Sequence, residues 1–285
     1  VISTYRNDNP LYYWLTNQVS YASVNGKVTS VSLHVNSLFT DGSYRLDYNE
    51  KLYDAIRGYT DALADETDAY HKALALHDAL TDNVDYAYES DGETPIKEQW
   101  AHTVEGALLK NFAVCESYAK AYQLLLNVCN VPNIYVTGSS RGVGHAWNMV
   151  QLANEWYWYD VTWDDQPNMP GGVIYDYACK TDEQFLQDHT IGDGQTGLNY
   201  LYGLPQRASA EYDNANAYEI GERFTDNNLT FAVCGYNAVS LIGVKASGKV
   251  TVPSAVTVNG RAYSVEQIGS DAFDGSILAS AVEIP

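Results

Sequence analysis

The sequence is poor in basic residues and in long apolar runs. Its 285 residues include 16 Lys and Arg against 36 Asp and Glu, which gives a formal net charge of −20. Such an excess of negative charge argues against nucleic acid or an anionic membrane as the main partner. No stretch approaches the roughly 20 apolar residues that a membrane span requires, and no signal peptide is visible. We expect a segment of a longer extracellular or cell-surface protein whose export signal has been removed.

Cysteine is also scarce, and the spacing of the cysteines indicates neither a metal site nor a disulfide framework. The four cysteines are scattered and form no CxxC pair, which argues against a zinc ribbon. Their spacing does not suggest a set of disulfides. We therefore expect no metal and no cofactor, and we look for a chemical use of a single thiol. The four are Cys115, Cys129, Cys179 and Cys234.

The residues that are present suit a folded protein with a polar, aromatic surface. The chain is 46% hydrophobic and 18% charged, and it holds 24 Tyr against 6 Phe. Changes in pattern along the chain indicate an α+β fold in three parts. We expect an N-terminal β segment at 1–50 packed on the core, a catalytic domain at 51–215 and a small β region at 216–285.

Periodicity predicts the elements around one of the cysteines. A helical pattern covers about 50 to 82, and a second helix carries an apolar stripe that begins at Cys115 and ends before Pro132. The stretches "NIYVTG", "GHAWNMVQL" and "EWYWYDVTW" then read as strands. Cys115 is thus expected in the first turn of its helix.

A cysteine at the start of a helix is a candidate nucleophile. The thiolate is the reactive form, and both a helix N-terminus and a neighbouring histidinium favour it. His145 begins a predicted strand, and a tight turn at Ala153-Asn154 would pair that strand with the next one. In this register His145 and Asp160 are diagonal neighbours on one face, roughly 7–8 Å apart. A shift of one residue would separate them.

These three residues offer the nucleophile, base and orienting group of covalent acyl transfer. Asp160 would fix the imidazole tautomer, and His145 would hold Cys115 as a thiolate and then protonate the leaving amine. The backbone N–H of Cys115 is expected to bind the oxyanion, with Gln99 as a candidate second donor. Trp147 and Trp163 are candidates to line a substrate cleft.

The stretches "GALLKNFAVCESYAKAYQLLL", "GHAWNMV" and "EWYWYDVTWDD" resemble the transglutaminase-like superfamily in its bacterial secreted branch. The resemblance covers about 60 to 190 and assigns the triad to Cys115, His145 and Asp160 in the same order. It implies a papain-like α+β core, with the cysteine helix packed on an antiparallel sheet. Its members include cross-linkers, cysteine peptidases, deamidases and inactive binding modules. Relatives usually carry Gly where Ser117 stands.

The end of the chain resembles a different family. The pattern "AYSVEQIGSDAFDGS…VEIP" is similar to the first unit of a BspA-like leucine-rich repeat. Because a single repeat cannot bury its own face, we expect the natural chain to continue.

Simpler interpretations apply to other candidates. Cys129 is expected to be a core residue, and His77, on an apolar helix stripe, a packed histidine. Asp164 and Asp165 are more often a solvated turn than a calcium site, since no EF-hand spacing follows. The remaining histidines have no partner signature and are expected to be structural or exposed. They are His34, His71, His102 and His189.

The sequence therefore predicts a monomeric, cysteine-dependent enzyme that acts on amide bonds of proteins or peptides, including cell-wall peptide. Hydrolysis is slightly favoured over transfer to an amine, since it needs only water access. The alternative is a surface adhesion module without activity, in which the repeats bind the partner. A carbohydrate-active enzyme lacks a convincing carboxylate pair.

Overall fold

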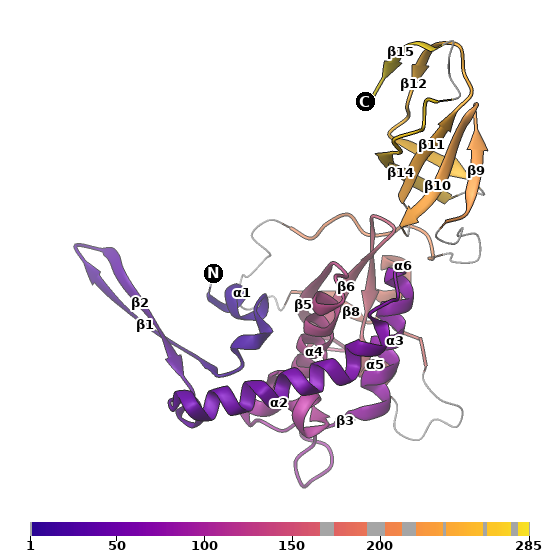
Figure 1. Ribbon diagram of the computed structural model, residues 1–285. Coiled ribbons are helices and arrows are strands. Elements are labelled where there is room, and N and C mark those ends of the chain that lie inside the picture. The colour runs from indigo at the N-terminus through magenta and orange to yellow at the C-terminus, as the bar shows by residue number, and fades with distance from the viewer. Residues whose placement is uncertain are drawn as a thin grey trace. The chain divides into compact units, whose positions relative to one another are not determined.

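The computed structural model describes residues 2–165, 174–192, 203–212, 221–235, 238–258, 261–274 and 279–284. The chain divides into two compact units, one made of 1–66 and 70–211 and the other of 67–69 and 212–285. Helices and an antiparallel sheet make up the first unit, and strands make up the second (Figure 1). The predicted α+β class, with a β-rich C-terminal region, is confirmed.

Six α-helices are described. They are α1 (Ile2–Asn7), α2 (Gly42–Thr60), α3 (Ala69–Asn83), α4 (Cys115–Val128), α5 (Val161–Asp164) and α6 (Asp182–Phe185). Four short 3-10 segments lie at Pro10–Tyr12, Ser37–Phe39, Asp61–Leu63 and Gln99–His102, and a π-helical turn lies at Gly106–Lys110. The predicted cysteine helix is therefore present and begins at the cysteine itself.

A four-stranded antiparallel sheet, in the order β7-β6-β5-β8, positions the site. Its strands are β5 (Asn133–Ser140), β6 (Val143–Leu152), β7 (Glu155–Tyr159) and β8 (His189–Ile191). Two short strands, β3 (Asp85–Tyr86) and β4 (Phe112–Ala113), pair in parallel just before α4. This pairing joins two segments that lie far apart in the sequence at the start of the cysteine helix.

Helix α4 packs on β5 and β6. Its apolar stripe is buried as predicted, with Tyr118, Ala121, Tyr122 and Leu125 each fully covered. The side-chain amide of Asn148 on β6 donates to the backbone oxygen of Ala119, 3.0 Å away, and so ties helix to sheet. The other side of β6 contributes to a second cluster. It contains Val136, Trp147, Met149, Trp158 and Phe185.

The first fifty residues contain more helix than predicted. Helix α2 begins at Gly42 because the Asp41 side chain caps it, accepting from the backbone N–H of Ser43 at 2.8 Å. The helical pattern predicted over about 50 to 82 is divided into two helices, which are separated by the 3-10 turn at Asp61–Leu63 and a short loop.

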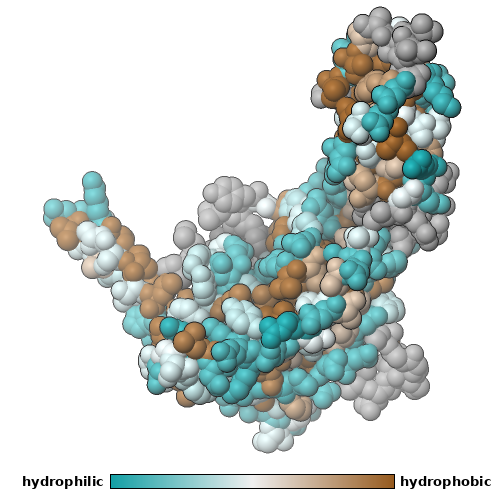
Figure 2. All heavy atoms as spheres, in the orientation of Figure 1, coloured by the Kyte–Doolittle hydropathy of each residue, from teal (hydrophilic) through white to brown (hydrophobic). Residues whose placement is uncertain are grey.

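Most of the N-terminal hairpin is exposed. Strands β1 (Leu15–Val24) and β2 (Lys27–Val35) pair with each other, and the structure buries Leu15 at their base but little beyond it. Apolar side chains are visible along the hairpin in Figure 2. The exposed ones are Val19, Tyr21, Val24, Val28, Val31 and Leu33. Packing of 1–50 on the core is thus limited to residues near the base, such as Tyr13 and Phe39.

The second unit is built from a five-stranded mixed sheet in the order β13-β14-β11-β10-β9, and from a parallel pair, β12 with β15. Phe231, Leu241 and Tyr263 are fully buried in its core. The resemblance of its end to a leucine-rich repeat stays a prediction. Its strands are β9 (Arg223–Asp226), β10 (Leu229–Gly235), β11 (Ala238–Val244), β12 (Gly248–Thr251), β13 (Ala255–Val258), β14 (Arg261–Ile268) and β15 (Ala279–Glu283). Among the described residues, no helix is both long enough and apolar enough to cross a membrane.

Candidate functional site

Cys115 is the first residue of α4, as the periodicity predicted. Val114 precedes it in an extended conformation and caps the helix without a side-chain bond. The first backbone N–H groups of a helix lack intrahelical partners and carry partial positive charge. The thiol is neither fully buried nor fully exposed, and it takes part in no disulfide. It is therefore available at the electropositive end of a helix.

Ser117 holds the segment that leads to Cys115. Its hydroxyl donates to the backbone oxygen of Thr103 and accepts from the backbone N–H of Ala107 at 3.0 Å. Gly106 lies so close that an added Cβ would stand 2.9 Å from the Ser117 Oγ and 2.7 Å from the Phe112 oxygen. The serine, where relatives usually carry Gly, therefore links α4 to the preceding π-helical turn.

A tight turn places His145 and Asp160 on neighbouring strands. Ala153 and Asn154 have φ of 59° and 63°, as a two-residue hairpin turn requires. Leu152 then pairs with Glu155, in the predicted register. The strand after the turn is shorter than predicted, because β7 ends at Tyr159 and Asp160 caps α5.

Asp160 is fully buried and uses both carboxylate oxygens. Oδ1 accepts from the backbone N–H groups of Thr162 and Trp163, at 3.1 and 3.3 Å. Oδ2 lies 2.6 Å from Nε2 of His145. The helix cap thus fixes the carboxylate that orients the imidazole, and the predicted contact between His145 and Asp160 is present.

Nδ1 is the ring nitrogen of His145 that does not face Asp160, and Cys115 lies close enough to the imidazole to raise its pKa. Burial lowers the pKa of His145, but the charge and hydrogen bond of Asp160, helped by Cys115, outweigh it and raise this pKa to about 10. Burial raises the pKa of Asp160, but His145 and His189 together bring it below its usual value. The imidazole is therefore held in its protonated form beside the sulfur.

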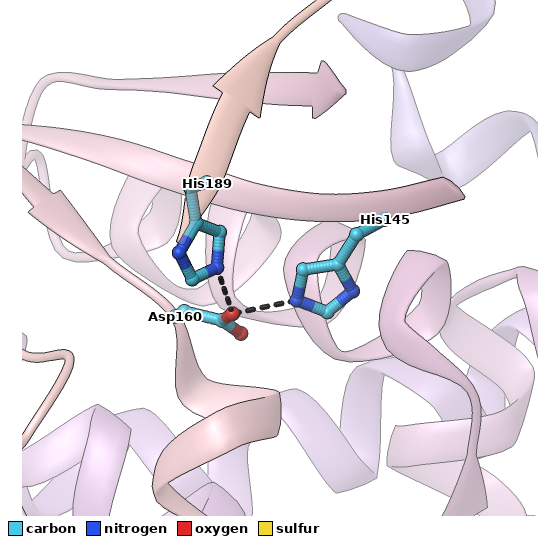
Figure 3. A group of neighbouring side chains, drawn as sticks. All are labelled: His145, Asp160 and His189. Atoms are coloured by element: carbon cyan, nitrogen blue, oxygen red, sulfur yellow. Dashed lines mark hydrogen bonds and ion pairs between the residues drawn. The ribbon is translucent and has the colours of Figure 1, made fainter. Parts of the chain in front are cut away.

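His189 is a site residue that the sequence reasoning missed. It begins β8, is completely buried, and directs Nε2 to the same Asp160 Oδ2 at 3.1 Å (Figure 3). Its Nδ1 lies 2.7 Å from Asp188 Oδ1. A glycine makes room for this strand, because a Cβ on Gly138 would stand 2.1 Å from the Thr190 oxygen and 2.5 Å from Trp147. In the sequence, Gly138 was the one residue that indicated a close approach of another strand.

Tyr86, on β3, is a second residue that was missed. Its side chain lies close enough to Cys115 for the thiol and the backbone N–H of that residue to affect the pKa of its hydroxyl. Burial and the charge of Cys115 raise the pKa of Tyr86, and the backbone N–H of Cys115 opposes the shift. A hydroxyl therefore lies near the amide that was expected to bind an oxyanion.

The other predicted site residues have different surroundings. Gln99 donates through Nε2 to the backbone oxygens of Tyr13 and Leu15, at 3.1 and 3.0 Å, so both amide hydrogens are engaged at the N-terminal segment. The structure therefore gives no support to Gln99 as an oxyanion donor. Trp147 is 1% exposed and belongs to the core, so it does not line an open cleft.

Trp163 lies directly at the site and is partly exposed. Its ring centroid is 5.8 Å from that of His145 and 4.9 Å from that of His189. The guanidinium of Arg141 lies 4.4 Å from the centroid of the same ring. Trp163 therefore covers the imidazoles, and it remains a candidate to contact substrate.

His77 is a packed histidine, as predicted, but its partners were not foreseen. It is fully buried between Asp164 Oδ2 and Asp78 Oδ1, each 3.0 Å away. Asp164 is buried and Asp165 bonds to the Tyr118 hydroxyl, so the expectation of a solvated turn is wrong. Burial raises the pKa of Asp165 to about 6, although the Tyr118 bond opposes the shift.

The remaining histidines agree with the structural or exposed role expected of them. His102 is the closest of these to Cys115 in the sequence, and it bonds Glu116 at 2.6 Å and the Ile96 oxygen at 3.0 Å. His34 contacts Ser20 on the exposed hairpin. Cys129 is buried at the end of α4, as predicted.

The ligand atoms of His145, Asp160 and His189 lie within 4.8 Å of one another, which is a spacing that a metal ion could use. Two imidazoles and a carboxylate are also a common donor set for first-row metals. The separations of 2.6 and 3.1 Å are those of hydrogen bonds, however, and Asp188 holds the far side of His189. The geometry is that of a hydrogen-bonded network of imidazoles and carboxylates. The absence of a metal stays a prediction.

Residues 57–161 match the family model described as the transglutaminase-like superfamily. This part of the chain is a transglutaminase-like domain. It includes Cys115, His145 and Asp160, and the start of α4 and the hairpin after it are the elements that hold them. The predicted family is confirmed for these residues.

The solved structures that are similar to the chain include these two. One is described as the crystal structure of a TGase, with 14% identity and a TM-score of 0.38 over 64% of this chain and 52% of that one. The other is described as a "Putative Cysteine Protease from Cytophaga hutchinsonii", with 16% identity and a TM-score of 0.27 over 55% of this chain and 64% of that one. The chain thus spans about half and about two thirds of their lengths. No curated protein matches it.

Proposed function

We propose that the transglutaminase-like domain catalyses cysteine-dependent acyl transfer or hydrolysis at amide bonds of proteins or peptides. The observation that carries the proposal is the hydrogen bond of His145 to the buried Asp160, with Cys115 at the start of α4 close enough to the imidazole to raise its pKa. In this arrangement the imidazole would act as the base between a nucleophilic sulfur and an orienting carboxylate.

The reaction would begin when the Cys115 sulfur attacks the carbonyl carbon of an amide. The electron pair of the C=O bond moves to the oxygen, and a tetrahedral intermediate forms. Collapse of the intermediate breaks the C–N bond, and the proton on His145 Nδ1 goes to the leaving nitrogen. Water or an amine then attacks the thioester and gives its proton to the same nitrogen, and the C–S bond breaks to release the product and restore the Cys115 thiolate. Asp160 keeps the ring oriented in both steps.

The oxyanion needs donors close to the attacked carbonyl. We propose the backbone N–H of Cys115 as one and the Tyr86 hydroxyl as the other. The hydroxyl lies near this N–H, so both groups would face the oxygen of an incoming carbonyl. Tyr86 would then turn its O–H toward the same oxygen.

An acyl-enzyme trap tests the function. The full chain is mixed with a peptide library, quenched in acid and examined by intact mass and peptide mapping. The expected result is an acyl group on Cys115, absent from Cys115→Ala, with loss of an amine from the peptide. The acyl group is then released from Cys115 in ¹⁸O-water that contains a primary amine. A product that carries ¹⁸O indicates hydrolysis and a product that carries the amine indicates transfer, and we expect hydrolysis. Failure of every peptide and protein tested to acylate Cys115 would favour a binding module.

The place of action follows as a further proposal. The strong negative charge and the resemblance to a secreted branch favour an extracellular or cell-surface enzyme whose substrates include cell-wall peptide. Fractionation of cells that produce the natural protein, with an antibody against this chain, tests that location. Detection only inside the cells would contradict it.

A further inference from the structure

Both ring nitrogens of His189 face carboxylate oxygens. Nε2 contacts Asp160 at 3.1 Å and Nδ1 contacts Asp188 at 2.7 Å. An ionised carboxylate only accepts hydrogen bonds, so each ring nitrogen must be a donor. His189 is therefore an imidazolium, and its positive charge stands beside the carboxylate that His145 uses.

The surroundings of His189 keep this cation in place. Its side chain is fully buried, and its ring stacks on Phe185 with centroids 4.0 Å apart. Asp188 is held in turn by the Tyr177 hydroxyl at 2.8 Å and by Arg141 at 3.4 Å. The charged and titratable groups facing the ring from the neighbouring elements are thus Asp160, Asp188, His145, Arg141 and Tyr177.

The consequence concerns the oxygen that two rings share. Asp160 Oδ2 accepts from His145 at 2.6 Å and from His189 at 3.1 Å, while Oδ1 is occupied by the backbone of α5. A positive charge near an acid favours its loss of a proton. The positive charge of His189 therefore weakens the attraction of Asp160 for the proton on His145.

We propose that His189, supported by Asp188, is a positioning residue that shares Asp160 with His145 and eases the release of the His145 proton to the leaving amine. The inference rests on the proposed function. An acid whose pKa lies far above the working pH donates its proton slowly. Without His189, the buried carboxylate of Asp160 would act on His145 alone and would raise the pKa of the His145 imidazolium further.

The test follows the alkylation of Cys115 by iodoacetamide across a wide pH range, in the full chain with EDTA present. Peptide mapping by mass spectrometry separates Cys115 from the other thiols. The variants are His189→Gln, which keeps a donor without the charge, and His189→Phe, which keeps the ring stack. His77→Gln is the matched control, because His77 is also buried between two carboxylates but does not touch Asp160. Thermal unfolding reports the stability of each.

The two pH limits of the Cys115–His145 ion pair are the inflections of the pH–rate profile at which the thiol and then the imidazolium lose their protons. We expect both His189 variants to move these two limits upward by about one unit, since loss of a cation raises the pKa of nearby acids. His77→Gln loses stability but keeps the pH limits of the wild type. Unchanged limits in the His189 variants, a downward shift, or an equal shift in His77→Gln would overturn the proposal.

Asp188→Asn provides an independent measurement if the His189 variants do not fold. It keeps the ring but removes the carboxylate that holds the charge on His189, so the limits are expected to move upward as in the His189 variants, and limits that stay or fall would overturn the inference. A wild-type Cys115 that reacts only under alkaline conditions would instead contradict the proposed function, whatever the variants do.

Discussion

Asp160→Asn is expected to remove most of the activity while leaving the fold in place. The amide can still cap α5 through its oxygen, as Asp160 Oδ1 does toward Thr162 and Trp163. Its NH₂ group then faces His145 Nε2, which must become an acceptor. The proton of a neutral ring moves to Nδ1, so the nitrogen that faces Cys115 can no longer take the thiol proton.

The size of the activity loss in Asp160→Asn follows from the environment of His145. A rise in its pKa from 6.5 to about 10 corresponds to about 5 kcal/mol of preference for the charged ring. Asp160 is the strongest of the groups that raise it, so its loss removes roughly half or more, about 2–3 kcal/mol. With the wrong tautomer added, we expect kcat/KM to fall by about 10³–10⁴.

The assay is turnover of the best peptide from the acyl-enzyme screen, with thermal unfolding as the measure of fold. Asp164→Asn is the matched control, because it is also a buried carboxylate of α5 bonded to a histidine, but that histidine is His77. A loss below tenfold in Asp160→Asn, or an equal loss of kcat/KM in the folded Asp164→Asn protein, would refute the reasoning.

Three further outcomes are expected. Tyr86→Phe should lower kcat by about 10²-fold with little change in KM, by the usual effect of one oxyanion donor, and a steady-state assay that shows unchanged kcat would remove Tyr86 from the site. Gly138→Ala should cost about 3 kcal/mol of unfolding free energy in urea melts, because its Cβ would meet the Thr190 oxygen at 2.1 Å; a neutral result would mean that β8 moves easily. The contribution of His145 to stability, up to about 5 kcal/mol, should be fully present below pH 6.5 and lost as the pH rises through about 10. Urea melts at several pH values check this, and a difference between wild type and His145→Ala that grows with pH would contradict it.

The sequence predicted the parts of the site that depend on local rules. The apolar stripe placed Cys115 at the start of α4, and the turn at Ala153-Asn154 set the register that brings His145 to Asp160. Both follow from backbone geometry over a few residues. Periodicity and turn chemistry are enough for such features.

Contacts between distant segments could not be predicted in the same way. His189 reaches Asp160 only because β8 pairs with β5 next to Gly138, and Tyr86 reaches Cys115 only because β3 pairs with β4. The strand around Trp147 has apolar residues on both faces, and its pattern does not say which face a later segment covers. Phe185 and His189 cover it, and the tryptophan becomes core.

The partners of Asp164 and Asp165 were missed for a related reason. Asp164 and Asp165 read as a polar turn because Asp is common in solvated loops. In the fold, Asp164 meets His77 from α3 and Asp165 meets Tyr118 from α4. A carboxylate is tolerated in the interior when it has such partners, and partners 47 and 87 residues away are set by the tertiary structure.

The most direct test of the central claim compares two thiols in one molecule. Cys115 and the exposed Cys234 are labelled with iodoacetamide at about pH 5.5, where an ordinary thiol is only about 0.1% ionised, and the rates are read by peptide mapping. We predict that Cys115 reacts at least about 100-fold faster than Cys234 and that His145→Ala abolishes the difference. Equal rates in the wild-type chain, or an advantage of Cys115 that survives His145→Ala, would contradict a thiolate held by an imidazolium.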